Sequence, residues 1–153
     1  MPTRRLLLSL VAMLLLAVPA MAELQTFPTG QLTIVTAKGD LRFTVEIATT
    51  PAQHEQGLMY RHHIDPGTGM LFDFGHPTTT AFWMKNTLIP LDMLFVGADG
   101  RIVNIHERAV PMSEETIPSA GPVRAVIELN GGASARLGIK PGDRVVYPIF
   151  GGK

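Results

Sequence analysis

The sequence predicts an α+β fold that is mostly β: a small antiparallel barrel or sandwich-like domain of about eight short strands with two short helices. Short runs rich in β-branched and aromatic residues recur along the chain, bounded by Gly, Pro, Asn and Asp, as is typical of strands joined by turns. Helix signals occur in only two places. The predicted elements do not alternate strand and helix, so a parallel βαβ sheet is not expected.

The first 22 residues have the three parts of a secretory signal peptide. Arg4-Arg5 forms the basic start, Leu6–Val18 is an apolar run, and Ala20-Met21-Ala22 matches the A-x-A cleavage pattern. The apolar run is shorter than the roughly 20 residues that a membrane span needs. We therefore expect a periplasmic or secreted protein with no membrane anchor after cleavage. Because the arginine pair also loosely resembles a twin-arginine signal, the export route stays open.

The composition of the chain is that of a globular protein, with 46% hydrophobic and 17% charged residues among 153. Removal of the two signal-peptide arginines leaves 11 basic residues against 13 acidic ones, a formal net charge of −2. Nucleic-acid binding, which needs a basic face, is not expected. The absence of cysteine excludes disulfides, thiolate metal sites and cysteine nucleophiles. We expect a leader over residues 23–31 and a single domain over residues 32–153.

The first elements after the leader are a hairpin and a helix. Residues 32–36 and 41–48 are β-branched, apolar runs separated by the turn sequence Lys38-Gly39-Asp40. The pair Thr50-Pro51 then predicts a helix start, with the threonine as N-cap and the proline at the first helical position. Residues 52–59 supply about two turns of this helix.

The middle of the chain is predicted to consist of strands and turns. Strands are predicted at residues 70–74, 81–86, 91–96 and 101–106. Residues 75–80 form a loop between the first two. Pro90 has no amide hydrogen and therefore separates the second strand from the third, and the turn Gly97–Gly100 leads into the fourth.

The last third of the chain combines a long loop, a strand, a helix and a closing strand. Residues 107–122 contain three prolines and little periodicity, so they form the longest predicted loop. Residues 123–129 alternate in polarity as a half-buried strand does. A short helix follows over residues 133–137, and Gly138 ends it as a left-handed C-cap with the next residue packing behind it. Residues 144–149 are the closing strand.

One segment, Ala81–Val96, contains the only tryptophan, a lysine, an asparagine and an aspartate inside an apolar run. A period of two places Trp83 and Lys85 on one face of a strand and Asn86 on the other. An aromatic ring beside a cation and an amide is what a pocket uses to stack a small ligand and orient it. Alternatively, Trp83 belongs to the core and the Lys85 stem reaches along it to water.

Asp92 lies in a strand that is otherwise apolar, so its charge needs a partner. Lys85, Asn86, Arg61 or backbone amides beside Pro90 could supply it, and Asp92 would then anchor the fold. A catalytic alternative pairs Asp92 with Glu128 as the acid and base of a hydrolase, a chemistry in which two carboxyl groups lie several ångströms apart.

Methionine and histidine are numerous, a combination that suits copper in an exported protein. Their spacing does not favour a site. His62 and His63 are adjacent and would point to opposite faces of a strand, and the patterns H-x-H and H-x-x-x-H do not occur. We expect no metal and no cofactor.

Several blocks of the chain resemble the domain of unknown function 192 family. The blocks are Gly57–Arg61, Gly69–Phe72, Phe82–Thr87, Ile89–Asp92, Ala125–Leu129 and Gly138–Val145, which cover nearly all of the chain from about Leu32. The resemblance implies a small, mostly β, barrel-like domain that is often exported and has no established activity. The family pattern singles out Met59, Arg61, Trp83, Lys85, Asn86, Asp92 and Glu128.

Three functional hypotheses follow. The leading one is an exported module that binds a small polar or anionic ligand in a pocket around Phe82–Thr87, with no catalytic residue assigned. Its ligand-binding residues would be Arg61, Trp83, Lys85, Asn86, Asp92 and Glu128. In this hypothesis Asp92 holds the cations in place. The alternatives are a hydrolase of glycans or related polymers that uses Asp92 and Glu128, and a protein-interaction module whose partner the sequence does not identify.

Overall fold

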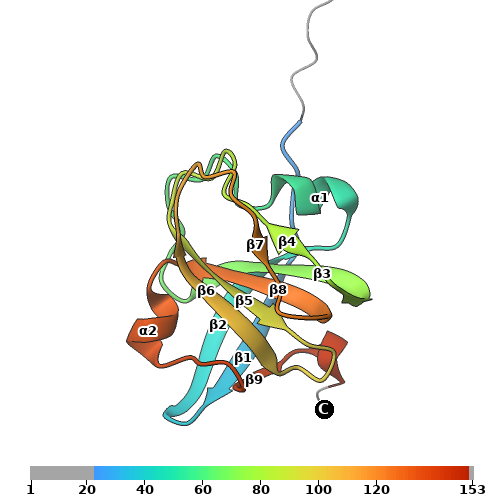
Figure 1. The fold of residues 1–153 in the computed structure, drawn as a ribbon, viewed down its shortest axis with the longest axis vertical. Helices are drawn as coiled ribbons and strands as arrows, with labels where there is room; N and C mark the ends of the chain where they lie inside the picture. The colour runs from blue at the N-terminus through green and yellow to red at the C-terminus, as the bar shows by residue number, and fades with distance from the viewer. Residues whose placement is uncertain (1–22, 152–153) are drawn as a thin grey trace, which may run out of the picture.

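The computed structural model describes residues 23–151 (Figure 1). The predicted signal peptide, residues 1–22, lies outside the described residues, as do residues 152–153. The described part contains nine strands, two short α-helices and one 3₁₀ turn, which confirms the mostly β prediction. Within it, no helix has the length and apolar character that crossing a membrane requires.

The strands and helices have the following bounds. The strands are β1 (Thr29–Thr36), β2 (Gly39–Ala48), β3 (Thr68–Thr78), β4 (Ala81–Phe82), β5 (Leu91–Val96), β6 (Ile102–Ala109), β7 (Ile117–Pro118), β8 (Val123–Asn130) and β9 (Arg144–Val146). The helices are α1 (Pro51–Gln56), α2 (Ala133–Leu137) and the 3₁₀ turn η1 (Pro148–Phe150).

Seven of the strands form one curled sheet in the order β6-β5-β8-β3-β2-β1-β9 (Figure 1). All neighbouring pairs are antiparallel except β2 and β3, which are parallel. The sheet curls far enough for its two edges to meet, because Arg101, next to β6, forms a bridge with Arg144 of β9. Strands β4 and β7 form a separate two-stranded sheet.

The central strands of the sheet are buried on both faces. One face contributes Phe43, Leu94 and Ile127 to a core that is closed by Ala133 of α2, and we call this the α2-side core. The other face contributes Phe72, Phe95 and Val126 to a second core that is closed by Leu58 and Met84 from loops, and we call this the loop-side core. Every residue of β5 is therefore buried, which explains why its sequence is apolar almost throughout.

The local signals at the helix ends are confirmed. Thr50 caps α1 through a reciprocal pair of hydrogen bonds with Gln53, and Pro51 occupies the first helical position. The helix ends at Gln56 rather than at residue 59, because Gly57 turns the chain with φ of 46°. Gly138 ends α2 in the left-handed conformation with φ of 77°, and the following isoleucine is buried. The hairpin between β1 and β2 is also as predicted.

The strand predicted over residues 81–86 is wrong beyond Phe82. Only Ala81 and Phe82 pair with a neighbouring strand. The Met84 amide donates instead to the Ser113 carbonyl, and Asn86 adopts a left-handed conformation with φ of 54°, which a strand does not accept. The alternation of side chains nevertheless persists, because Met84 is buried while its neighbours point outward.

Four other boundaries differ from the predicted ones. Strand β3 continues through the predicted loop 75–80 as far as Thr78, with a register shift beside Gly75. The predicted loop 107–122 is shortened at one end by β6 and is crossed by β7. The closing strand stops at Val146, because Pro148 starts the 3₁₀ turn η1. Strand β1 begins at Thr29, inside the predicted leader.

Candidate functional site

Three loops meet at one end of the molecule, at the upper end of Figure 1. They are residues 57–66, 83–90 and 110–116, and we call this region the three-loop end. Backbone hydrogen bonds join the loops: the Tyr60 amide donates to the Asn86 carbonyl over 2.9 Å, and the Met112 amide donates to the Thr87 carbonyl over 3.0 Å. The loops therefore support one another as a unit.

The three-loop end contains three of the four non-glycine residues that have positive φ in the described part of the chain. They are Tyr60 at 65°, Asn86 at 54° and Met112 at 64°, and the fourth is Arg108 at 52°. A left-handed conformation costs an ordinary residue about 1–2 kcal/mol, and such residues cluster at functional sites. The backbone strain thus marks this end as a candidate site.

Large apolar side chains are exposed on the same loops. Of the eight exposed large apolar side chains in the described residues, five lie here: Tyr60, Trp83, Leu88, Val110 and Met112. Apolar side chains that gather on one part of a surface mark sites of interaction. Trp83 is 45% exposed, so it is not a core residue.

Both predicted cations of the site, Lys85 and Arg61, lie beside acidic residues of the protein itself. Lys85 Nζ lies 5.0 Å from the centre of the Trp83 ring and 4.0 Å from the Glu114 carboxylate. Arg61 Nη2 lies 2.9 Å from Glu46 Oε1.

Asn86 has a partner in the neighbouring loop. Its side-chain amide donates to the Tyr60 hydroxyl over 3.2 Å and lies 4.0 Å from Met59 Sδ. These contacts bring Met59 and Asn86, both suspected from the sequence, to the same end of the molecule as Trp83.

Asp92 does not belong to this group. It is fully buried, and its carboxylate accepts hydrogen bonds from the backbone amides of Arg108 (2.8 Å), Gly132 (2.7 Å) and Ser134 (2.8 Å). The prediction that Asp92 holds the cations of the pocket is therefore wrong. Asp92 instead caps the start of α2 from the neighbouring strand, as an N-cap carboxylate would. Backbone amides were among the predicted partners, but the observed donors are those of Arg108, Gly132 and Ser134 and not amides beside Pro90.

The surroundings of Glu128 differ from those of Asp92, because they are apolar and supply no hydrogen-bond donor among the described residues. Glu128 projects from β8 into the loop-side core, where its register neighbours are Met70 and Met93. The residue is 4% exposed, and no described residue makes a hydrogen bond or ion pair with its carboxyl group. Burial raises the pKa of Glu128 to about 8, because desolvation disfavours the ionised form.

A small cleft joins Glu128 to Trp83. It has a volume of about 40 Å³ and lies between α1 and the three-loop end. Besides Glu128 and Trp83, its walls include Met59, Phe82 and Thr87. Two residues that are far apart in the sequence thus line one cleft, and one of them carries a carboxyl group that has no hydrogen-bond partner among the described residues.

Asp92 and Glu128 do not form a carboxylate pair. In the ladder between β5 and β8, Glu128 is opposite Met93 and Asp92 is opposite Leu129. Adjacent residues of a strand point to opposite faces, so the two carboxyl groups project to opposite sides of the sheet. The geometry does not assemble the acid and base that the hydrolase hypothesis needs.

Sequence reasoning missed Glu46 and Tyr60 as partners in this region. Glu46 lies in a strand of alternating polarity and pairs with Arg61 from another element, which local patterns do not predict. Tyr60 could have been suspected, because it lies inside the block Gly57–Arg61 that carries the family resemblance.

Comparison with known proteins places the chain in a family. Residues 33–147 match the model of DUF192, "Uncharacterized ACR". A protein from Sinorhizobium meliloti 1021, described as a proposed transcription regulator, is similar with 50% identity and a TM-score of 0.77 over 80% of this chain and 96% of that one. A protein of unknown function from Novosphingobium aromaticivorans DSM 12444 is similar with 44% identity and a TM-score of 0.79 over 86% of this chain and 94% of that one.

No curated protein matches the chain. The family match spans most of the sequence and includes Trp83, Asp92, Glu128 and the three-loop end. The chain belongs to the DUF192 family, as the resemblance of its sequence blocks predicted.

Proposed function

We propose that this protein is an exported binding module whose ligand contacts Trp83 and places one polar group against Glu128. The observation that supports this most directly is the buried Glu128 carboxyl group, which lines the cleft and has no hydrogen-bond partner among the described residues. Burial desolvates this carboxyl group and raises its pKa. A ligand that donates a hydrogen bond to it offsets part of the cost of that desolvation on binding.

The size of the cleft limits what enters it. At 10–15 Å³ for each water site, about 40 Å³ corresponds to roughly three water molecules. Only a slender polar group of the ligand fits, so the rest of the ligand lies outside the cleft, over exposed side chains such as Trp83, Tyr60 and Met112. Aromatic side chains such as Trp83 and Tyr60 supply contact area at low cost in conformational entropy.

The charges around the cleft favour a polar ligand over an anionic one. Arg61 is paired with Glu46, and Lys85 lies between the Trp83 ring and Glu114. An anionic ligand would have to compete with these carboxylates for the same cations. Of the two predicted ligand classes, polar and anionic, the polar class therefore has more support.

A protein partner is the second candidate, and the five exposed apolar side chains of the three-loop end favour it. The description of the Sinorhizobium meliloti relative raises a role in regulation for this chain as well. Direct DNA binding gains no support from charge, because residues after the predicted signal peptide carry 11 basic and 13 acidic side chains.

The fluorescence of Trp83 tests the proposal directly, because it is the only tryptophan in the chain. The purified protein is titrated with sugars, amino acids, amines, organic acids and cell-wall fragments. At least one class should change the emission in a saturable way. Glu128→Met, which replaces the carboxyl group by an apolar side chain of similar length, should weaken that ligand about tenfold or more.

Glu107→Gln is the matched control, because Glu107 is exposed and does not line the cleft. It should leave the affinity unchanged. A ligand whose affinity ignores Glu128→Met contradicts the proposed role of Glu128. No saturable change with any class contradicts small-ligand binding and favours the protein partner. Export is tested separately by sequencing the N-terminus of the protein recovered outside the cytoplasm, which should begin at Glu23.

A further inference from the structure

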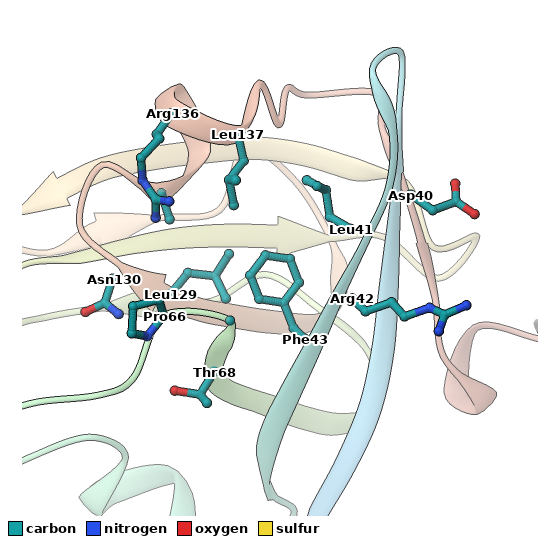
Figure 2. A pocket seen from close by; sticks show the side chains of 12 residues that line it. Asp40, Leu41, Arg42, Phe43, Pro66, Thr68, Leu129, Asn130, Arg136 and Leu137 are labelled. Carbon is teal, nitrogen blue, oxygen red and sulfur yellow. The ribbon is translucent and has the colours of Figure 1, made fainter.

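A second cavity lies on the other side of the sheet from the Trp83 cleft. Its volume is about 240 Å³, and Phe43 of β2 and Leu129 of β8 form its floor beneath α2 (Figure 2). Both residues belong to the α2-side core, whereas the Trp83 cleft opens from the loop-side core. The cavity is thus an extension of the α2-side core that reaches solvent, and it is independent of the site described above.

The floor of this cavity accepts an apolar body of limited size. The buried Phe43 and Leu129 lie next to each other in the floor, and the partly buried Leu41 of β2 and Leu137 of α2 lie above them (Figure 2). A dry apolar cavity of about 150 Å³ holds a benzene molecule. The observed 240 Å³ therefore has room for a six-membered ring or a branched chain together with one small polar group. It is smaller than the roughly 300–1,000 Å³ of pockets for larger ligands.

Arg136 supplies the charge at the rim of the cavity. It projects from α2 beside the opening, on the side of Asn130 (Figure 2), and no hydrogen bond or ion pair joins its guanidinium to any described residue. Asn130 is held in place, because its side-chain amide donates to the Ile64 carbonyl over 3.0 Å. A guanidinium presents paired donors that match the two oxygens of a carboxylate.

The other charged residues of the wall do not compete for this position. Arg42 and Asp40 alternate with Leu41 and Phe43 along β2, so their side chains leave the strand on the far side and point away from the cavity (Figure 2). Lys38 lies against Gly138 at the end of α2, where an added Cβ would be 3.1 Å from Nζ. The local field is therefore positive at the end of the cavity that α2 covers.

We infer that this cavity binds a small carboxylate with an apolar ring or branched chain, with the apolar body against Leu41 and Leu137 over the floor of Phe43 and Leu129 and the carboxylate on Arg136. The size of the cavity selects a compact ligand, and Arg136, the cation of its wall that points toward it, selects one negative charge. This cavity and the Trp83 cleft share no lining residue, so the inference can be tested independently of the proposed function.

Calorimetric titration with sodium benzoate tests the inference, with benzyl alcohol and benzylamine as probes of the same ring without the negative charge. Benzoate should bind with Kd near or below about 1 mM, and the other two should bind at least about tenfold more weakly. Arg136→Gln should weaken benzoate binding about tenfold or more. The matched control Arg42→Gln, from the same wall but pointing away, should stay within about twofold.

Leu137→Trp provides a test that does not depend on charge, because the indole occupies the cavity. It should abolish benzoate binding while far-ultraviolet circular dichroism remains unchanged. Equal binding of benzoate and benzyl alcohol, equal weakening by the two arginine variants, or no benzoate binding up to about 10 mM would each overturn the inference.

Discussion

Asp92 and Glu128 are buried carboxyl groups on neighbouring strands, and their surroundings are opposite. Asp92 accepts three backbone hydrogen bonds, whereas Glu128 accepts none from the described residues and lines a cleft. One faces the α2-side core and the other faces the loop-side core. The comparison teaches that burial alone does not mark a carboxyl group as functional. What distinguishes the candidate is the absence of a partner within the fold.

Two of the three hydrogen-bond donors to Asp92 lie where the chain leaves β8 and enters α2. Gly132 adopts a left-handed conformation with φ of 84°, and its amide and that of Ser134 both point at the carboxylate. Arg108, the remaining donor, is itself left-handed with φ of 52°. The strained backbone at Arg108 thus donates a hydrogen bond to a buried carboxylate, and hydrogen bonds to charged groups are stronger than those between neutral groups.

Asp92→Ala should have the largest effect on stability. Each hydrogen bond to a charged group contributes about 1.5–3 kcal/mol, so loss of all three should lower the free energy of unfolding by roughly 5 kcal/mol. Asp92→Asn keeps an acceptor oxygen and should lose about half as much. Urea unfolding measures both. A loss below about 1 kcal/mol for Asp92→Ala would contradict its role as the anchor of α2.

The same carboxyl-to-amide change at Glu128 should have the opposite sign at neutral pH. Burial raises the pKa of Glu128 from 4.5 to about 8 in the folded protein, so the folded state binds this proton more tightly than the unfolded state. The stabilisation is fully present below about pH 4.5 and is lost as the pH rises to about 8. The pKa difference corresponds to a loss of the order of 4 kcal/mol.

Urea unfolding of wild type and Glu128→Gln at several pH values between 4.5 and 8 isolates this contribution. The stability of the variant relative to wild type should rise with pH across the window. His54 and Glu55 also line the cleft, but they are present in both proteins and largely cancel in the difference. A difference that does not change with pH would mean that Glu128 is ionised in the folded protein and has a partner.

Local features of the fold were predictable from the sequence. The cap at Thr50-Pro51, the left-handed Gly138 and the hairpin between β1 and β2 each depend on a few consecutive residues. Turn and cap chemistry is specific enough to be read at that range. The strand predicted over residues 81–86 was wrong beyond Phe82. Side chains continue to alternate there, although the backbone no longer pairs with a neighbouring strand.

The surroundings of the candidate site were not predictable. The sequence indicated that Asp92 needed a partner, but its donors lie 16, 40 and 42 residues away and are backbone amides, which nearly every residue carries. Glu128 was recognised as a residue to suspect. Its burial depends on loops from elsewhere in the chain that cover the loop-side face of β8, and no local pattern encodes that contact.

The smallest expected effect tests whether the three-loop end stores strain. Met112 is exposed and left-handed with φ of 64°. In Met112→Gly, relief of about 1 kcal/mol of strain offsets the 0.5–1 kcal/mol that glycine costs through the unfolded chain, so stability should change by less than about 0.5 kcal/mol. Val110→Gly is the matched control, because Val110 is also exposed on the same loop and does not have positive φ.

Val110→Gly should therefore be destabilised by about 1 kcal/mol, and thermal unfolding of the two variants side by side measures the difference. Equal losses in the two variants would mean that the left-handed backbone at Met112 carries no cost. Backbone strain would then cease to distinguish the three-loop end from the well-anchored region around Asp92, and the case for a site at this end would depend on Glu128 and the exposed side chains alone.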